Sequence, residues 1–303
     1  MYSRTVIFLR KCRAFCFMVK RIAIIGGSGL EDLARGEKNE RTGVVRFEYY
    51  LTKVGDMEVV FVPRHGAEHQ NLPLDVPYED IFRNLKTERV EAILAFSATG
   101  TLDHRVPLAD QKSFVVPHDF IRGYGYQPVS ARIKEHPHPV LSEPFHPKMR
   151  EAILASGKEL GYRMAEKGIY ILNEGNGFET KAEIALLNAG LHYPLLVSFL
   201  NDVFQKLGSP PEIRSTLELL RFSGINHLDI TGAQVGMTAP KEVVLAAEYG
   251  IPIGLIACPV NIAEGMSAER LGHDRTMAVI SASKPYIKDL AFAVIGKLND
   301  VEF

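Results

Sequence analysis

The chain has 303 residues, of which 46% are hydrophobic and 23% are charged, and its formal net charge is -1. This composition is typical of a globular protein and excludes the disordered and fibrous classes. The near-neutral charge argues against a nucleic-acid-binding protein, and no apolar run reaches the roughly 18 residues of a membrane span. Three cysteines cannot form a disulfide framework, so we expect a cytoplasmic location.

The first 17 residues differ from the rest of the chain. They carry four basic residues and no acidic residue. A signal peptide is a poor match, because the apolar part is short and no small-residue cleavage site follows. An organellar transit peptide and an over-extended start before Met18 are two alternatives, and we favour the second. We therefore expect an N-terminal extension at 1–17 and one domain over 18–303.

Apolar runs rich in β-branched residues alternate along the chain with helical patterns. Turn residues or small residues end the runs, as is typical of buried strands. This order predicts an α/β fold, a single domain with a central mixed β-sheet flanked by helices. Strands are expected at 21–25, 58–63, 91–100, 113–117, 168–175 and 251–260, and helices at 79–88, 146–161, 241–249 and 268–298.

One segment does not fit this alternation. Residues 188–230 contain apolar helical stretches that are broken by the Gly-Ser-Pro-Pro run at 208–211. Such a pattern indicates added helices rather than a linker. We therefore expect an atypical insertion at about 188–230 within the domain.

The residues after the first two strands favour anion binding. Gly-Gly-Ser-Gly at 26–29 offers backbone N–H groups and a hydroxyl in a turn that suits phosphate, although glycine turns after strands are common. Arg64 can offer a two-pronged donor to phosphate, and His65 a further donor. The alternatives are an arginine in a surface salt bridge and a capping histidine.

Two further strand ends carry hydroxyl groups. Ser-Ala-Thr-Gly at 97–100 ends the third strand, and Thr238 precedes a helix, where it can cap the helix and bind an anion. In α/β folds the sites lie at such strand ends. Four ends with hydroxyl, glycine or arginine therefore predict one convergent phosphate site.

These motifs resemble the trimeric type of nucleoside phosphorylase, the family of methylthioadenosine phosphorylase and purine nucleoside phosphorylase. The resemblance covers about residues 20–187 and 231–303, and several ordered motifs carry it. The matching pieces are IIGGSGL at 24–30, PRHG at 63–66, SATG at 97–100, SEPFHPKMRE at 142–151, EGNGFETKAE at 174–183 and VGMTAPKEVVLAAEYGI at 235–251.

The resemblance implies a nucleoside and inorganic phosphate as substrates, and neither a metal nor an organic cofactor. It implies that Met237 packs near the ribose and Phe178 near the base. It also implies a homotrimer or a dimer of trimers, in which His138 reaches into the neighbour's sugar pocket; the alternative for His138 is an exposed loop residue. The implied phosphate-binding residues are Ser28, Arg64, His65, Ser97, Ala98 and Thr238.

Three residues separate the branches of this family by base. Adenine-specific members carry aspartate at the position of Asn261 and again two residues on, where this chain has Ala263. The amide of Asn261 can donate to a 6-oxo oxygen or to N7, and Glu179 resembles the carboxylate that accepts from N1–H in 6-oxopurine enzymes. Adenine has no N1–H, so both residues favour a 6-oxopurine. The alternative for Glu179 is a helix cap beside Thr180.

The group at the 5′ position depends on His273. Enzymes for ordinary nucleosides place a histidine there to bind the 5′-hydroxyl, and enzymes for methylthio nucleosides place an apolar residue there. His273 therefore favours inosine and guanosine, unless it is only the first residue of a helix. The chain departs from the family at Asn176-Gly177, where Pro-Arg is common, and in the segment 188–230.

Together these residues predict a purine nucleoside phosphorylase, a pentosyltransferase of purine salvage, with Asn261 and Glu179 as its catalytic pair. The alternative within the family is a phosphorylase of methylthioinosine or methylthioadenosine. A non-catalytic nucleotide sensor is disfavoured, because a sensor need not keep Arg64 and His65. A dinucleotide oxidoreductase is disfavoured because the early glycines lack the third spaced glycine.

Overall fold

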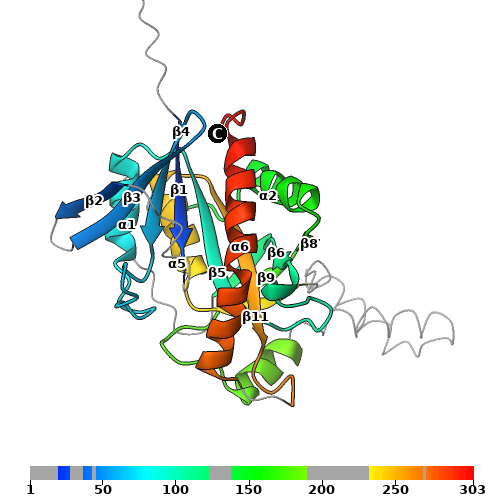
Figure 1. Cartoon of the computed structure of the whole chain (residues 1–303). Coiled ribbons are helices and arrows are strands. Elements are labelled where there is room, and N and C mark those ends of the chain that lie inside the picture. Colours follow the sequence, from blue (N-terminus) through cyan, green and yellow to red (C-terminus); the bar gives the residue numbers. More distant parts are fainter. Residues whose placement is uncertain (1–19, 28–36, 43–45, 123–137, 190–231, 269–270) are drawn as a thin grey trace, which may run out of the picture.

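The structure is a computed structural model, and it describes residues 20–27, 37–42, 46–122, 138–189, 232–268 and 271–303 (Figure 1). The expected extension at 1–17 and nearly all of the expected insertion at 188–230 lie outside these residues. Ser28 also lies outside them. None of the helices in this part of the chain is long and apolar enough to cross a membrane.

The described strands form one sheet of eleven strands, and helices pack on both of its faces. The strands are β1 (Arg21–Gly26), β2 (Glu37–Thr42), β3 (Arg46–Val54), β4 (Met57–Pro63), β5 (Ala92–Thr101), β6 (Ser113–Val115), β7 (Asp119–Arg122), β8 (Arg163–Ala165), β9 (Ile169–Leu172), β10 (Gln234–Gly236) and β11 (Ile253–Ile262). The helices are α1 (Tyr78–Thr87), α2 (Pro147–Glu159), α5 (Ala239–Tyr249) and α6 (His273–Leu298), with a 3₁₀ turn at Ala109–Gln111.

The sheet is mixed, as expected from the sequence. Its main path runs β2-β3-β4-β1-β5-β10-β9-β7, and β11 joins β5 to β6, which in turn pairs with β8. Strands β4, β1, β5 and β11 are parallel neighbours, whereas β10 runs antiparallel to β5. All six expected strands and all four expected helices are present, with boundaries that differ by a few residues.

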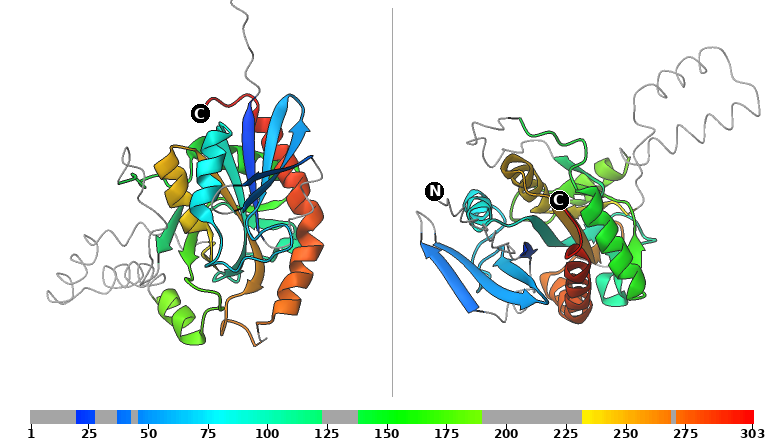
Figure 2. Two further views of the ribbon diagram at one scale, coloured as in Figure 1. Left: turned by 90° about the vertical axis from the view of Figure 1, so that its left-hand side faces the viewer. Right: turned by 90° about the horizontal axis from the view of Figure 1, so that it is seen from above.

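Alternation along the central strands explains the three layers. In β1, Ile22 and Ile24 pack with α2 and α6 on one face of the sheet. Ala23 and Ile25 pack with α1 and α5 on the other face. Because successive side chains of a strand point to opposite faces, an entirely apolar strand is covered on both sides. Figures 1 and 2 show the long helix α6 on the face opposite α1 and α5.

Along one edge of β5 the neighbouring strand changes from β1 to β10, and this change positions the site. The first half of β5 pairs with β1, through residues 92–95. Its last two residues, Gly100 and Thr101, pair instead with β10. The opposite edge of β5 stays paired with β11 throughout. Residues 96–99 therefore have a free edge between the end of β1 and the start of β10.

Candidate active site

A cavity of about 270 Å³ lies beside this free edge of β5. Strands β4, β5, β10 and β11 contribute their carboxyl ends or the residues that follow, and α6 closes one side. This is the position at which α/β folds form ligand sites. The lining residues are Gly27, Arg64, His65, His69, Asn71, Leu72, Pro73, Ser97, Ala98, Thr99, Gly100, Asn176, Phe178, Glu179, Val235, Gly236, Met237, Thr238, Val260, Asn261, Thr276, Met277 and Ile280.

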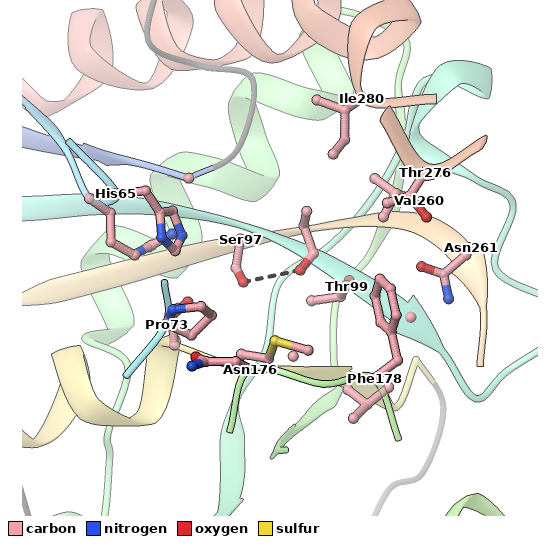
Figure 3. A pocket seen from close by; sticks show the side chains of 18 of the residues that line it. His65, Pro73, Ser97, Thr99, Asn176, Phe178, Val260, Asn261, Thr276 and Ile280 are labelled. Atoms are coloured by element: carbon pink, nitrogen blue, oxygen red, sulfur yellow. Dashed lines mark hydrogen bonds between the residues drawn. The ribbon is translucent and has the colours of Figure 1, made fainter. Parts of the chain in front are cut away.

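The cavity has two chemically different ends. In Figure 3, His65 and Ser97 lie toward one end, and Phe178 and Asn261 lie toward the other. The first end gathers cationic and hydroxyl groups, which suit an anion. The second gathers an aromatic ring, an amide and a carboxylate, which suit a flat polar ring with donors and acceptors on its edge.

Arg64 is held at the first end by a buried ion pair. Its Nε and Nη2 donate to the two carboxylate oxygens of Glu242 on α5, the second at 2.8 Å. Burial acts to lower the pKa of Arg64, but the facing Glu242 carboxylate outweighs it and raises the pKa. The guanidinium therefore stays charged, and its plane is fixed.

The remaining nitrogen of Arg64 faces the glycine turn after β1. A Cβ atom on Gly27 would lie 2.7 Å from Nη1 of Arg64, so only glycine allows this approach without a shift. The turn that the sequence predicted as an anion nest begins here. Arg64 is thus brought to the nest, although Ser28 itself is not described.

His65 lies beside Arg64 with one ring nitrogen already used. Its Nδ1 lies 2.8 Å from the carbonyl oxygen of Asn71, so Nδ1 carries a proton and donates to this oxygen. The His69 ring lies 4.6 Å from the His65 ring, centroid to centroid. This contact and the bond to Asn71 fix the orientation of the His65 ring.

Thr238 also reaches the cavity, but it does not cap its helix. It is the residue before α5, and no side-chain hydrogen bond caps that helix. The expectation that Thr238 caps α5 is therefore wrong. Its side chain lines the cavity together with Met237, Ser97 and Ala98. The sequence placed Thr238, Ser97 and Ala98 at a phosphate site and Met237 near the ribose.

Asn261 and Glu179 meet over Gly100 at the second end. A Cβ atom on Gly100 would lie 3.0 Å from Nδ2 of Asn261 and 3.5 Å from Oε1 of Glu179. Nδ2 of Asn261 donates to the carbonyl oxygen of Ile262 at 3.0 Å, which leaves its second N–H for a ligand. The amide and the carboxylate therefore converge on one place, as the base-recognition hypothesis requires.

Glu179 is not a helix cap. Thr180 and Glu183 form the capping box instead, with the Thr180 backbone N–H donating to Glu183 at 2.7 Å and the Glu183 N–H donating to the Thr180 hydroxyl at 3.2 Å. Burial raises the pKa of Glu179, and hydrogen bonds from the backbone of Glu179 itself and of Glu264 oppose this rise. The carboxylate is thus buried beside the cavity and free of the capping task.

A bulge in β11 brings two successive residues to the cavity. The register with β5 shifts between Pro259 and Asn261, so Val260 is the extra residue. Without a bulge, Val260 and Asn261 would point to opposite faces of the sheet, whereas both line the cavity. Bulges are common where a strand must redirect a side chain to a site.

Ala263 does not line the cavity. Its backbone N–H donates to the carbonyl oxygen of Thr101, and its side chain packs in an apolar cluster with Leu102 and Ile169. The expectation that Ala263 lies at the base site is therefore wrong, because β11 ends at Ile262 and Ala263 is buried in this cluster. The side chain of Ala263 therefore has no contact with the cavity.

Two other expected site residues lie apart from this lining. His138 is exposed and is not among the residues that line the cavity of its own chain. His273 is the first residue of α6, and its side chain is not described. One turn later, Thr276 and Met277 line the cavity, so the start of α6 borders the site. The roles of both histidines stay predictions.

Sequence reasoning missed two features of the site. Glu242 was not singled out, although an acid in the first turn of a largely buried helix needs a cationic partner. The loop after His69 was also missed. It is tied across the cavity mouth by the Leu74 backbone N–H, which donates to Oδ1 of Asn176 at 3.2 Å. Asn176 was noted only as a departure from the family pattern.

Comparison with known proteins agrees with this geometry. The family model of the phosphorylase superfamily matches residues 21–192. The chain belongs to the phosphorylase superfamily. The matched range includes Arg64, Ser97 and Glu179, which line the cavity.

Named relatives of this phosphorylase cover nearly its whole length. The 6-oxopurine nucleoside phosphorylase of Pyrococcus furiosus is 28% identical and covers 91% of this chain and 92% of its own. The "Probable S-methyl-5'-thioinosine phosphorylase" of Methanopyrus kandleri is 28% identical over 89% of each chain. The methylthioadenosine phosphorylase of Schistosoma mansoni has the same fold, with a TM-score of 0.68, 20% identity and 93% of each chain covered.

Proposed function

We propose that the protein is a purine nucleoside phosphorylase of purine salvage, which cleaves inosine and guanosine with inorganic phosphate to the free base and ribose 1-phosphate. One observation carries the proposal. A single cavity has His65 toward one end and Asn261 toward the other (Figure 3), with Arg64 beside Gly27 and Glu179 beside Asn261 at Gly100. Its volume of about 270 Å³ suits a small ligand.

Phosphate occupies the first end in this proposal. The Nη1 of Arg64 and the hydroxyls of Ser97 and Thr238 donate to its oxygens, and the turn after Gly27 adds backbone N–H groups. The ring of His65 lies at the same end of the cavity. Because the Glu242 carboxylate already neutralises Arg64, the directed donors, more than net charge, select the anion.

The purine occupies the second end. Asn261 donates through its second N–H to O6 or N7, and Glu179 accepts from N1–H. Phe178 supports the base, and Met237 packs against the ribose. Adenine has no N1–H and carries an amino group in place of O6, so it would leave Glu179 without its donor and an Asn261 amide at the O6 position without its acceptor.

The proposed chemistry follows from these positions. A phosphate oxygen attacks the anomeric carbon as the bond from that carbon to N9 breaks, and the electron pair of the broken bond goes to the purine. Asn261 stabilises the negative charge that develops on the base, and the phosphate anion faces the cationic sugar. The departing base takes up one proton, and hydrogen phosphate gives up one as it becomes the sugar ester, so the reaction balances. Inorganic phosphate is the co-substrate, and the reaction as proposed uses no metal and no organic cofactor.

A second candidate is the phosphorolysis of a 5′-methylthio nucleoside. The cavity is lined by Leu72, Met277 and Ile280, and apolar side chains suit a methylthio group. His273 favours a hydroxyl group instead, at the start of the helix that carries Met277 and Ile280. The relative from Methanopyrus kandleri carries the methylthio name.

We further propose that the active form is a cytoplasmic homotrimer or a dimer of trimers. Exposed side chains support an assembly near the cavity mouth, because Phe178 is 48% exposed and Leu72 is 54% exposed in the single chain. His138 and Val140 are exposed as well. A second subunit would cover such apolar groups.

The test is an assay of purified protein with inosine, with and without inorganic phosphate. Phosphate-dependent release of hypoxanthine together with ribose 1-phosphate supports the proposal. Release of ribose without phosphate would make the protein a hydrolase. Binding of inosine without any cleavage would favour a sensor.

A further inference from the structure

A buried tyrosine behind the cavity connects two of its walls. Tyr170 lies in the middle of β9, and none of its surface is exposed. A tyrosine in an apolar strand normally finds a partner for its hydroxyl group. The Tyr170 hydroxyl lies 2.9 Å from Oγ of Ser97, which lines the cavity. The proposed mechanism gives Tyr170 no part.

The same hydroxyl group reaches the start of α5. Burial raises the pKa of Tyr170, and the hydrogen bond with Ser97, the charge of Arg64 and the nearby backbone of Thr238 and Ala239 oppose this rise. Thr238 makes no side-chain capping bond to α5. The Tyr170 hydroxyl is thus a polar group beside the first turn of this helix, whose N–H groups have no partner within the helix.

Gly236 leaves room for the hydroxyl group of Tyr170. A Cβ atom on Gly236 would lie 2.1 Å from the oxygen of Tyr170, so any other residue there would displace it. Gly236 lies directly before Met237 and Thr238 in the cavity wall. The close approach of β10 to Tyr170 is therefore built into the sequence.

These contacts set the direction of the hydrogen bonds. A phenol oxygen has one proton to donate and two lone pairs. Ser97 Oγ donates to the carbonyl oxygen of Ala98, so in the 2.9 Å contact the phenol proton points to Ser97 Oγ. The bond to Ala98 is a long 3.4 Å, so the Ser97 proton can turn toward a ligand in the cavity.

We propose that Tyr170 is a positioning residue, which turns the Ser97 hydroxyl into a donor toward phosphate and fixes the start of α5 beside it. Phosphate oxygens accept hydrogen bonds, so a serine that donated to Tyr170 could not donate to them. The proposal rests on the proposed function in its choice of phosphate as the ligand. It predicts that Tyr170 affects phosphate and leaves the nucleoside unaffected.

The experiment compares Tyr170→Phe, Ser97→Ala and the double variant. Tyr49→Phe is the matched control, because it removes another buried hydroxyl group, bonded to Glu88 at 3.2 Å. We measure the Kd of inorganic phosphate by calorimetry and the KM of each substrate. Tyr170→Phe should raise the Kd and KM of phosphate about 10-fold, as expected for a lost hydrogen bond to a charged group. The KM of the nucleoside should stay within about 2-fold, since it does not contact this hydroxyl group.

The double variant decides between positioning and a general structural effect. If Tyr170 acts through Ser97, the double variant binds phosphate about as weakly as the weaker single variant. Fully additive losses, an unchanged phosphate Kd in Tyr170→Phe, or an equal loss in Tyr49→Phe would overturn the proposal. If Tyr170→Phe does not fold by circular dichroism, an unchanged phosphate Kd in Ser97→Ala overturns it, and a raised Kd supports it.

Failure of this inference is distinct from failure of the proposed function. The calorimetry uses phosphate alone and needs no nucleoside. A wild-type protein that binds phosphate in a Tyr170-dependent way but cleaves no nucleoside would support the inference and contradict the proposed function.

Discussion

Arg64 and Glu242 face each other inside the protein as a doubly hydrogen-bonded ion pair, and each side chain is only 1% exposed. Glu242 orients the guanidinium so that Nη1 is directed at the glycine turn. Truncating one partner would leave the other as a buried charge without a partner, which costs about 3–5 kcal/mol. The pair thus links the anion site to the stability of the fold.

The first prediction concerns this pair. Arg64→Ala should raise the KM of phosphate about 100-fold, because it removes a donor and leaves the Glu242 carboxylate facing the anion. It should also lower the free energy of unfolding. The double variant Arg64→Ala/Glu242→Gln should recover part of both losses, since the stranded charge is gone.

Steady-state kinetics and urea unfolding measure these two effects. Arg83→Ala is the control, because it breaks an exposed ion pair with Glu79 on α1 and should cost about 0–1 kcal/mol. A double variant that is worse than Arg64→Ala in both measurements would contradict the account of the pair.

The second prediction is the pH dependence of Glu179. Burial raises the pKa of its carboxyl group above the ordinary 4.5. Because the ionised form accepts from N1–H, kcat/KM for inosine should fall as the pH drops through this raised pKa. Glu179→Gln should lower kcat/KM and remove this acid limb. Glu151→Gln, at an exposed residue of α2, should keep the limb where it is.

The raised pKa of Glu179 also predicts that the variant Glu179→Gln is more stable than the wild type at pH 7. A folded pKa above the unfolded one contributes stability below the unfolded pKa, and this contribution is lost as the pH rises through the folded pKa. At neutral pH the ionised Glu179 therefore destabilises the unliganded protein. Glu179→Gln should raise the Tm at pH 7, and a lower Tm would contradict this.

The third prediction concerns Asp103, which follows β5 and accepts a hydrogen bond from Gly232, just before β10. Burial acts to raise its pKa, but Arg105, bonded at 2.8 Å, and the backbone N–H of Gly232, bonded at 3.0 Å, outweigh it and lower the pKa to about 2. Such a group stabilises the fold above its unfolded pKa, and this contribution is lost as the pH falls through the folded pKa.

Asp103→Asn should therefore lower the free energy of unfolding at pH 7. The difference from the wild type should shrink as the pH falls from the ordinary pKa of 3.8 toward about 2. Asp80→Asn, in an exposed pair with Arg83, is the control and should show little difference at either pH. A difference for Asp103→Asn that persists in acid would contradict this role.

The fourth prediction tests whether His138 acts across a subunit border. Mixed oligomers of Arg64→Ala and His138→Ala subunits should regain activity, because some sites then combine an intact Arg64 with a neighbour's intact His138. Activity after mixed refolding, compared with each variant alone, measures this. Light scattering should show a trimer or a multiple of it. A fully active monomer, or no gain on mixing, would exclude the cross-subunit role.

The sequence was informative where a segment obeys a single rule. The strands at 21–25 and 251–260 are continuous apolar runs, and both are present as β1 and β11. Strands β8 and β10 were missed because three residues each are too few for a pattern. The longer strands β2, β3 and β7 were not predicted either. The helix expected from 268 begins only at His273, after Gly272 in an extended conformation.

The sequence likewise identified some residues of the site and missed others. Arg64 and Ser97 stand at strand ends, so local patterns placed them at the site, whereas the family resemblance placed Asn261 there. Glu242 and Tyr170 act through partners that are distant in sequence: 178 residues separate Arg64 from Glu242, and 73 separate Ser97 from Tyr170. Only the packing of the sheet brings these pairs together. The bulge at Val260 and the burial of Ala263 likewise depend on the register with β5.

The fifth prediction addresses base choice directly. The measurement is kcat/KM for inosine, guanosine, adenosine, methylthioinosine and methylthioadenosine at saturating phosphate. Two unpaired buried groups at about 1–3 kcal/mol each should favour the 6-oxopurine nucleosides over the adenine nucleosides roughly 10²–10⁴-fold. Asn261→Asp should narrow this ratio, and a methylthioinosine rate above that of inosine would favour the second candidate. Equal or faster cleavage of adenosine and methylthioadenosine would contradict the roles of Asn261 and Glu179.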